Sequence, residues 1–230
     1  MLMKKLVNKL HRSKFLGTIF PTLDYCLRKE ILGCESALDL GCGPSSPLQY
    51  CKNIKYSVGV EAFQPYLEES KRKKIHTEYI EKKIEEVDFP ENRFDAVILI
   101  EVLEHLPEKE GYAVLEKAKK WSRKKIIVST PNGYLFQREL DNNQMQKHLS
   151  GWDTEKMRQM GFECRGLAGL KCLRREVQDN TMGDDLTTTI KYRPRMLWFA
   201  AATLSQIITY QLPNRAFELF CVKKIKKFRP

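Results

Sequence analysis

The sequence predicts a doubly wound α/β domain with a mostly parallel sheet, and three observations carry this prediction. An apolar run at 36–40 contains Asp39 and leads into Gly41-Cys42-Gly43, which is typical of a buried strand entering a tight turn. A second apolar run, at 55–61, ends in Glu61 about twenty residues later, as in the nucleoside-binding half of such folds. Further apolar runs alternate with helical patterns, which favours parallel strands covered by helices.

The elements are expected in the following order. Seven strands are predicted at 36–40, 55–61, 77–81, 94–100, 125–130, 162–173 and 216–222. Helices are predicted near 46–52, 64–74, 108–122, 153–160 and 196–210, with Asp153 as the cap and Gly161 as the end of the fourth. Residues 1–33 have an amphipathic, basic helical pattern, and 174–193 are polar and predict a mobile loop.

Composition limits the class of protein. A chain of 230 residues with 42% hydrophobic and 30% charged residues suits one decorated soluble domain. The seven cysteines include no Cys-x-x-Cys pair, which predicts free thiols in a reducing cytoplasm. We expect neither a secretory signal nor a transmembrane segment, because no apolar run approaches about 20 residues.

The net charge of +11 leaves several partners open. Basic clusters lie at 71–74, 117–125 and 223–229. They suit a nucleic acid, an anionic membrane surface or an anionic substrate, but solvated helix faces are the favoured interpretation because the clusters are scattered.

The acid before the glycine turn indicates which ligand the turn binds. Asp39 stands two residues before Gly41, where a pyrophosphate would meet a negative charge. The third small residue of a dinucleotide fingerprint is matched only loosely, by Ser46. S-adenosylmethionine, which carries an ammonium and a sulfonium but no phosphate, would be attracted instead.

Asp39-x-Gly41-x-Gly43, Glu61 and the run Phe94-Asp-Ala-Val-Ile-Leu99 together resemble class I S-adenosylmethionine-dependent methyltransferases over roughly 34–162. The resemblance implies a Rossmann-like, seven-stranded, mostly parallel sheet whose last strand is antiparallel to the sixth. It also implies S-adenosylmethionine as the cofactor. We expect a helical cover at 1–33 and the methyltransferase domain at 34–230, with a substrate-side insertion at about 174–214.

Cofactor contacts are expected at the ends of the first three strands. Glu61, with Ala62 beside it, would accept the ribose hydroxyls, and Gly41, Cys42 and Gly43 would let backbone approach the methionine part. Cys42 is expected there as a small side chain without chemistry. Asp39 would face the cationic end of the cofactor or cap the turn itself. Ile84 would contact adenine, although Lys83 stands where relatives carry an acid, and Glu85 or Glu86 serves if the register differs.

A second motif, Glu101-Val-Leu-Glu104-His105, follows the fourth strand. If it is helical, Glu101, Glu104 and His105 share one face, which suits a divalent metal. The motif resembles the metal-binding segment of small-RNA terminal 2′-O-methyltransferases and the matching segment of ubiquinone-pathway O-methyltransferases, and His148 matches a fourth ligand by position. Without a metal, Glu101 would face the methionine end of the cofactor, and His148 or His105 is a candidate general base.

The expected function is methyl transfer to an oxygen or nitrogen of a small or glycan-like acceptor. Tyr134, Phe136 and Trp152 would line the acceptor pocket or, alternatively, belong to the core. Two other functions remain open: a metal-assisted RNA ribose 2′-O-methyltransferase, and a non-catalytic S-adenosylmethionine-binding protein. Nucleic acid is not favoured as a partner, and a peripheral membrane contact is the alternative role of 1–33.

Overall fold

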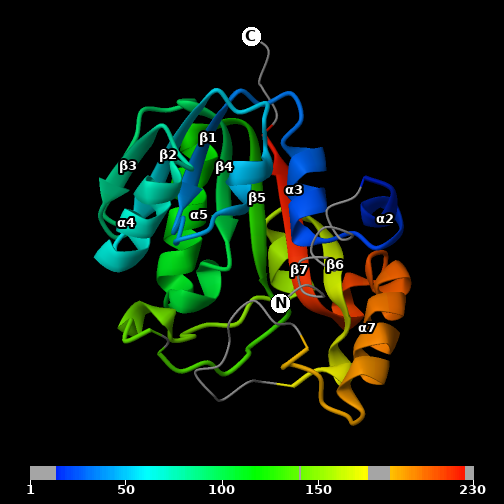
Figure 1. Cartoon of the computed structure of the whole chain (residues 1–230). Helices are drawn as coiled ribbons and strands as arrows, with labels where there is room; N and C mark the ends of the chain where they lie inside the picture. The colour runs from blue at the N-terminus through cyan, green and yellow to red at the C-terminus, as the bar shows by residue number, and fades with distance from the viewer. Residues whose placement is uncertain (1–13, 140, 176–186, 226–230) are drawn as a thin grey trace.

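The computed structural model describes residues 14–139, 141–175 and 187–225. Its centre is a seven-stranded sheet with the order β3-β2-β1-β4-β5-β7-β6 (Figure 1). The strands are β1 Ser36–Leu40, β2 Tyr56–Glu61, β3 Glu78–Glu81, β4 Phe94–Ile100, β5 Ser122–Pro131, β6 Glu163–Leu170 and β7 Ala216–Lys224. All seven predicted strands therefore form, each within a few residues of its expected range.

Strands β1 to β5 pair in parallel, whereas β7 lies antiparallel between β5 and β6. The predicted fold class, including the reversed last strand, is confirmed. We call the edge at which β1, β2, β4 and β5 end the carboxyl edge. Because β7 runs the other way, it begins at this edge, and Glu218 lies opposite Pro131, the last residue of β5.

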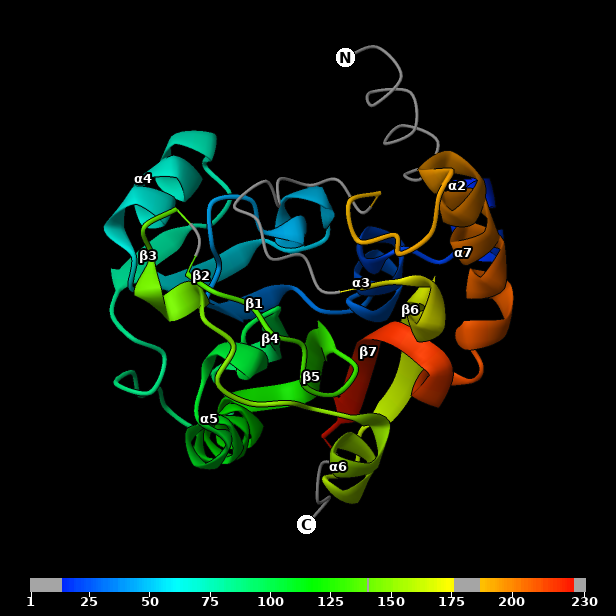
Figure 2. The same cartoon turned by 90° about the horizontal axis from the view of Figure 1, so that it is seen from below.

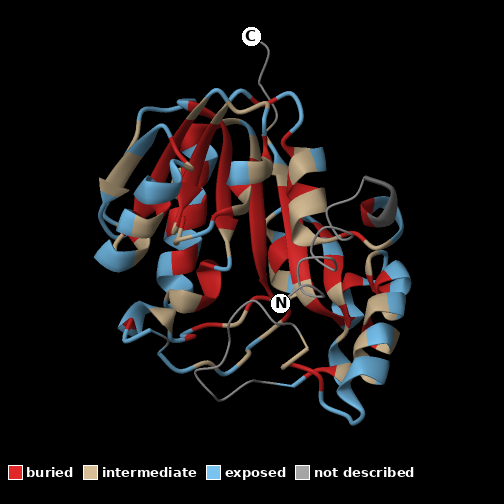
Figure 3. Ribbon diagram, viewed as in Figure 1, coloured by how far each residue is buried: buried red, intermediate tan, exposed pale blue. Residues whose placement is uncertain are grey.

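Helices cover both faces of the sheet (Figure 2). Leu38 and Leu40 of β1 join an apolar core that includes α5 (Glu108–Trp121) and α6 (Thr154–Gln159), whereas Ala37 faces the opposite core with α3 (Leu23–Glu30). Helix α4 (Gln64–Lys73) contacts β2 and β3, α7 (Arg195–Thr209) packs on β6, and α2 (Lys14–Ile19) contacts α3. The buried residues concentrate in the central strands and the helix sides that face them (Figure 3).

Three expectations need correction or limits. The helix expected near 46–52 is only a 3₁₀ turn, Pro47–Tyr50, because Ser46 turns its hydroxyl toward Asp39 and caps that turn. The sixth strand ends at Leu170 and continues as a 3₁₀ turn, Lys171–Leu173. The N-terminal helical pattern is confirmed at α2 and α3, whereas 1–13 and most of the polar segment 174–193 lie outside the described residues.

Most described residues of the basic clusters lie away from the carboxyl edge, but Lys73 donates to the Pro44 carbonyl (2.8 Å) and to Ser45 Oγ (2.6 Å), next to the glycine turn. Lys71–Lys74 closes α4, which runs back from the end of β2, and 117–125 spans the end of α5 and the start of β5. Lys223 and Lys224 end β7 at the same, opposite edge. Among the described residues, no helix is long and apolar enough to cross a membrane.

Candidate active site

The glycine turn after β1 presents its backbone at the carboxyl edge. Gly41 has a φ of +68°, and its N–H donates to the carbonyl of Val60 in β2 (2.8 Å). A Cβ on Gly41 would lie 2.7 Å from Cγ2 of Val102, whereas a Cβ on Gly43 (φ +55°) would meet nothing within 4 Å. Only glycine fits the first position, and the second leaves open space in which a ligand can approach the backbone.

Glu61 ends β2 directly beside this turn. Its carboxylate accepts the N–H of Gly43 (Oε2, 3.0 Å) and the N–H of Phe63 (Oε1, 2.8 Å). Burial raises the pKa of Glu61, and these backbone donors oppose that rise. A carboxylate has about four lone-pair sites, so roughly two remain for the hydroxyls of a ribose.

Asp39 lies beneath the turn rather than in the open crevice. Its side chain is buried and accepts the hydroxyl of Ser46, which is the capping role that the sequence left open. Burial raises the pKa of Asp39 to about 7, and nearby Glu61 adds to the rise while Ser46 opposes it. His76 Nε2 is 3.5 Å from Asp39 Oδ2, but burial lowers the pKa of His76 to about 4, so this contact is not an ion pair.

Asp39 predicts a pH dependence of stability. Its folded pKa lies above the unfolded value, so the unfolded chain loses this proton first as pH rises, and stability falls between about pH 4 and pH 7. The Asp39→Asn variant has no carboxylate whose charge must be buried. Its new amide can donate to His76 Nε2, which lacks a hydrogen-bond partner among the described residues. We expect the variant to gain stability relative to the wild type from pH 5 to pH 8, by on the order of 3 kcal/mol.

Urea unfolding of both proteins at pH 5, 6, 7 and 8 measures this difference. Glu35→Gln, which removes an exposed carboxylate paired with Lys55, is the control and should show no such trend. A stability difference between Asp39→Asn and wild type that is flat across this range contradicts the assignment.

The other predicted cofactor residues lie near the same turn. Cys42 is buried, and its side chain packs toward Gly59 and the His76 ring, so it serves as a small core group; burial raises the pKa of its thiol. Ala62 is partly buried next to Glu61. Ile84 is buried in the apolar core after β3, and its contact with adenine stays a prediction.

The motif after β4 does not form the helix that would align its polar residues. Glu101 takes a left-handed φ of +55°, and only Leu103–His105 forms a 3₁₀ turn. The chain must bend sharply here because the Glu101 N–H still bonds the Ser129 carbonyl of β5 (2.9 Å). The condition for a shared helical face is therefore not met, although the turn still brings the three side chains to one region.

Three carboxylates meet at this point: those of Glu101 and Glu104 in the segment after β4, and that of Glu218 in β7. Ser129 Oγ lies 2.6 Å from Glu101 Oε1 and 2.8 Å from Glu218 Oε1, yet a hydroxyl has one proton to donate. Burial raises the pKa of Glu101 well above its usual value, and Glu218 and Glu104 raise it further. Burial likewise raises the pKa of Glu218. The cluster therefore favours an extra proton or a bound cation near neutral pH. Residue Glu101 is nevertheless exposed overall, so the cluster reaches the surface of the protein.

Two histidines adjoin the buried carboxylate of Glu104. One oxygen of Glu104 accepts the Thr130 hydroxyl (2.8 Å), and the other, Oε1, is buried without a hydrogen-bond partner among the described residues unless Glu101 is protonated. Ligand atoms of Glu104, His105 and His148 lie within 4.8 Å of one another. His105 Nδ1 faces the Lys147 carbonyl (3.1 Å) and His148 Nδ1 faces that of Leu135 (2.6 Å), which assigns the Nδ1–H tautomer and leaves Nε2 as the acceptor on each ring.

His105 is neutral at physiological pH, because burial, and to a lesser extent nearby His148, lowers its pKa to about 4. A neutral imidazole is the form that accepts a proton or binds a metal. The Glu104 backbone holds this geometry together, since its carbonyl accepts the N–H groups of Leu149 (2.7 Å) and Ser150 (3.1 Å). Glu101 lies beside this group but is not one of its three members.

The three aromatic residues expected either to line the acceptor pocket or to belong to the core do not all take the same role. Trp152 is fully buried and belongs to the core, whereas Tyr134 and Phe136 are exposed on the loop after β5. The Trp152 ring packs against that of Tyr112, with centroids 5.0 Å apart. Only Tyr134 and Phe136 therefore remain available to an acceptor.

Sequence reasoning missed Glu218 and Arg174. Glu218 is an acid within the otherwise apolar run 216–222, a signal that was present but unused. Arg174 is buried, and burial lowers its pKa to about 10, although the charge of Glu218 opposes this. Its Nε donates to the carbonyl of Ala168 (2.6 Å). Arg174 therefore keeps its positive charge and partly offsets the acid cluster.

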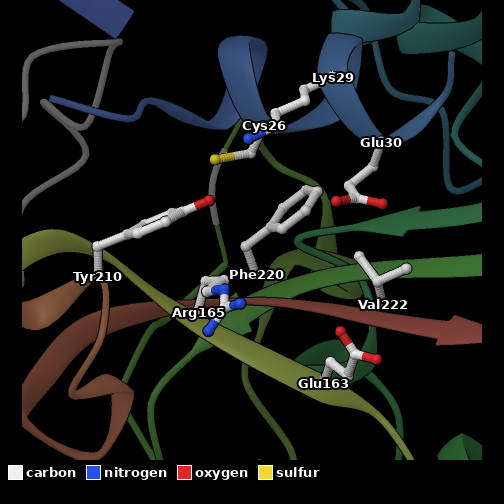
Figure 4. Close-up of a pocket in the computed structure, with 8 residues that line it drawn as sticks. All are labelled: Cys26, Lys29, Glu30, Glu163, Arg165, Tyr210, Phe220 and Val222. Atoms are coloured by element: carbon white, nitrogen blue, oxygen red, sulfur yellow. The ribbon is translucent and has the colours of Figure 1, made fainter. Parts of the chain in front are cut away.

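Two hollows lie elsewhere on the described part of the chain. The hollow between α3, β6 and β7, which Cys26, Arg165 and Tyr210 help to line, measures about 40 Å³ and is too small for a cofactor (Figure 4). A second, of about 470 Å³, lies near His76 and Lys73. Neither hollow is lined by Gly41, Gly43 or Glu61, so the polar groups at the carboxyl edge remain the candidate site.

Comparison with known proteins shows what part of the chain resembles. Residues 38–127, which include the glycine turn, Glu61 and Glu101, match a protein family described as a methyltransferase domain. Over this range the chain is similar to methyltransferase domains. None of the curated protein sequences compared with the chain matches it.

Solved structures show the same fold beyond the matched residues. A SAM-dependent methyltransferase from Archaeoglobus fulgidus is 14% identical over 91% of this chain and 98% of its own, with a TM-score of 0.55. The plantazolicin methyltransferase BpumL, in complex with SAH, is 12% identical over 97% and 90%, with a TM-score of 0.53. The PH0226 protein from Pyrococcus horikoshii OT3 is 20% identical with a TM-score of 0.45, and the match spans 53% of this chain and 60% of that protein. The first two matches extend the methyltransferase fold to nearly the whole chain.

Proposed function

We propose that the chain is an S-adenosylmethionine-dependent methyltransferase whose cofactor lies on the glycine turn and Glu61. One observation carries the proposal. The Gly43 N–H, which in a dinucleotide site would donate to a phosphate, donates here to the carboxylate of Glu61. The short 3₁₀ turn Pro47–Tyr50 also replaces the long helix whose N-terminus would bind pyrophosphate. Two similar proteins are described as SAM-dependent or SAH-bound, which supports the same cofactor here.

The chain's contribution to the reaction would be orientation, since S-adenosylmethionine supplies the activated methyl group when bound. The bond from methyl carbon to sulfur breaks as the bond to the acceptor oxygen or nitrogen forms, and the electron pair stays on sulfur. The acceptor must also lose a proton. His105 and His148, with Nε2 as the acceptor on each ring, are the groups proposed to take it.

The acceptor is proposed to be small or glycan-like and to enter between Glu101 and the loop after β5. The carboxylates of Glu101 and Glu218 can accept hydrogen bonds from hydroxyl or amino groups. Tyr134 and Phe136 offer exposed rings on which a sugar or other flat apolar surface could stack.

Calorimetry and a transfer assay test this function. The full chain should bind S-adenosylmethionine, fail to bind NAD, and transfer labelled methyl to a component of a cell extract. Binding without transfer in any extract would favour the non-catalytic binding protein, and binding of NAD in place of S-adenosylmethionine would refute the cofactor assignment.

Metal-assisted transfer to a hydroxyl, such as an RNA ribose, is the second candidate, and the group Glu104, His105 and His148 favours it. One carboxylate and two imidazoles suit a divalent ion of intermediate softness, and Glu104 Oε1, which is buried without a hydrogen-bond partner among the described residues, fits such a ligand set. The ion would polarise the acceptor oxygen. Against RNA, the basic residues at the start of β5 and at the end of β7 lie at the opposite edge of the sheet. A steep salt dependence of any RNA binding would support RNA nonetheless.

We expect the metal-free chain to bind one Mn²⁺, Co²⁺ or Zn²⁺, and His105→Ala/His148→Ala to weaken that binding at least about 100-fold, since two of three ligands are removed. Calorimetry and the visible spectrum of Co²⁺ measure it without an assay of activity. Glu108→Ala is the matched control, because this acid is exposed and pairs with Lys156 instead. Equal binding by the double variant, or activity indifferent to a chelator, would remove the metal from the mechanism.

A further inference from the structure

Helix α7 presents its apolar side to solvent. Leu204 and Ile208 keep 61% and 60% of their surface exposed, and four more apolar residues of the same region are exposed: Met196, Leu197, Ile207 and Leu212. These positions recur at helical spacing, so they form one continuous stripe, the outer face of α7. A helix of a globular domain normally turns such a stripe toward the core.

The orientation of α7 is fixed by the opposite, polar side. Gln206 Nε2 donates to the Gly166 carbonyl of β6 (2.8 Å), and Gln206 Oε1 accepts the Gly169 N–H (2.8 Å). Ser205 Oγ accepts the N–H of Leu170 (2.9 Å). The helix backbone lies so close to β6 that a Cβ on Gly169 would meet the Ala202 carbonyl oxygen at 2.0 Å. The polar contacts satisfy buried backbone groups, so α7 cannot rotate its apolar stripe inward without losing them.

The charges around the outer face of α7 indicate what covers it. From Thr187 to Arg215 the sequence contains no Asp or Glu, and it contains four basic residues, all exposed: Lys191, Arg193, Arg195 and Arg215. Three of them precede or begin the helix, beside the paired rings of Tyr192 and Trp198, whose centroids are 5.0 Å apart. An exposed apolar stripe with basic residues and amphipathic aromatics at its end is the pattern of an interfacial helix.

We propose that the outer face of α7 docks on an anionic lipid bilayer, with the helix lying in the plane of the interface. The stripe would enter the boundary between headgroups and acyl chains, and the basic residues would contact anionic headgroups. Fifteen residues span only about 22 Å, so the helix lies along the surface and does not cross it. A second copy of this chain fits less well, because 187–215 contains no acid that could pair with the basic residues of the facing copy.

Vesicle flotation of the full chain tests the proposal. Wild type should bind vesicles that contain about a third phosphatidylglycerol in phosphatidylcholine, and bind pure phosphatidylcholine at least about tenfold more weakly. Leu204→Glu/Ile208→Glu should lower binding by at least about 100-fold, because two apolar anchors become acids. Leu32→Glu, at an exposed apolar position in the turn before β1, is the matched control and should bind as wild type.

Two further measurements separate α7 from the other basic surfaces. Tryptophan emission should shift to the blue on binding through Trp198, since Trp121 and Trp152 are already buried. Arg193→Glu/Arg195→Glu should lower binding at least about tenfold. The proposal is overturned if wild type does not bind these vesicles, or if Leu204→Glu/Ile208→Glu binds them as wild type does. It is also overturned if sedimentation shows a dimer that this double variant dissolves.

Discussion

A Glu61→Ala variant is expected to bind S-adenosylmethionine about 100-fold more weakly than wild type. The proposed complex gives Glu61 two hydrogen bonds to the ribose hydroxyls, and bonds to an ionised group contribute about 1.5–3 kcal/mol each. Part of this is offset by solvation of the free ligand, so a net loss of about 3 kcal/mol, or 100-fold, is the expectation. Calorimetry of the purified variant measures it.

Glu61 also supports the turn, because it accepts the N–H groups of Gly43 and Phe63, so lost affinity alone does not prove a contact with ribose. A 2′,3′-dideoxy form of the cofactor product separates the two roles. Wild type should bind it far more weakly than the natural product, whereas Glu61→Ala should hardly distinguish them, because the partner group is already gone.

Glu78→Ala provides the matched control. This acid begins β3, the neighbour of β2, and is exposed at the end of the strand away from the site. It should bind the cofactor as wild type does. If Glu61→Ala keeps full affinity, or still discriminates against the dideoxy compound, then the ribose lies elsewhere.

The central strands could be predicted closely from the sequence because parallel strands are buried on both faces. Such strands appear as continuous apolar runs, and β4, Phe94–Ile100, was predicted residue for residue. Strand β5 starts three residues earlier than expected, at Ser122. The first residues of β5 are polar, because Arg123 and Lys124 bind Asp95 at the edge of the sheet. A strand boundary predicted from an apolar pattern is therefore misplaced where the end of the strand is polar.

The proximity of the glycine turn to Glu61, where we propose that the cofactor binds, was predictable for the same local reason. The glycine turn and Glu61 each follow a recognisable strand, and parallel pairing of β1 with β2 brings them together. The helical arrangement considered for Glu101 does not form because the backbone of this residue is bonded to β5, a contact distant in sequence. Glu218 joins the acid cluster only because β7 inserts antiparallel beside β5, which no local pattern of residues around it reveals.

Trp152→Ala is expected to reduce the free energy of unfolding by about 3–5 kcal/mol, the usual cost of deleting a fully buried large aromatic. The indole N–H donates to Ser150 Oγ (2.9 Å), and the Trp152 carbonyl accepts the Gly133 N–H (2.7 Å). Trp152 thus holds the loop that contains His148 against the end of β5. Urea unfolding measures the loss, and Trp198→Ala, at a half-buried ring, should cost less than about 1 kcal/mol.

A double-mutant cycle with Gly111 shows whether this ring, and not the loop in general, accounts for the loss. A Cβ on Gly111 of α5 would lie 2.4 Å from Cζ2 of Trp152, so Gly111→Ala should destabilise the wild type. In the Trp152→Ala background the clash is absent, and alanine should stabilise α5 by up to about 1 kcal/mol through helix propensity. The same substitution therefore changes sign between the two backgrounds. Additive effects would mean that Trp152 and Gly111 do not touch, and that the loop carrying His148 is held by other contacts.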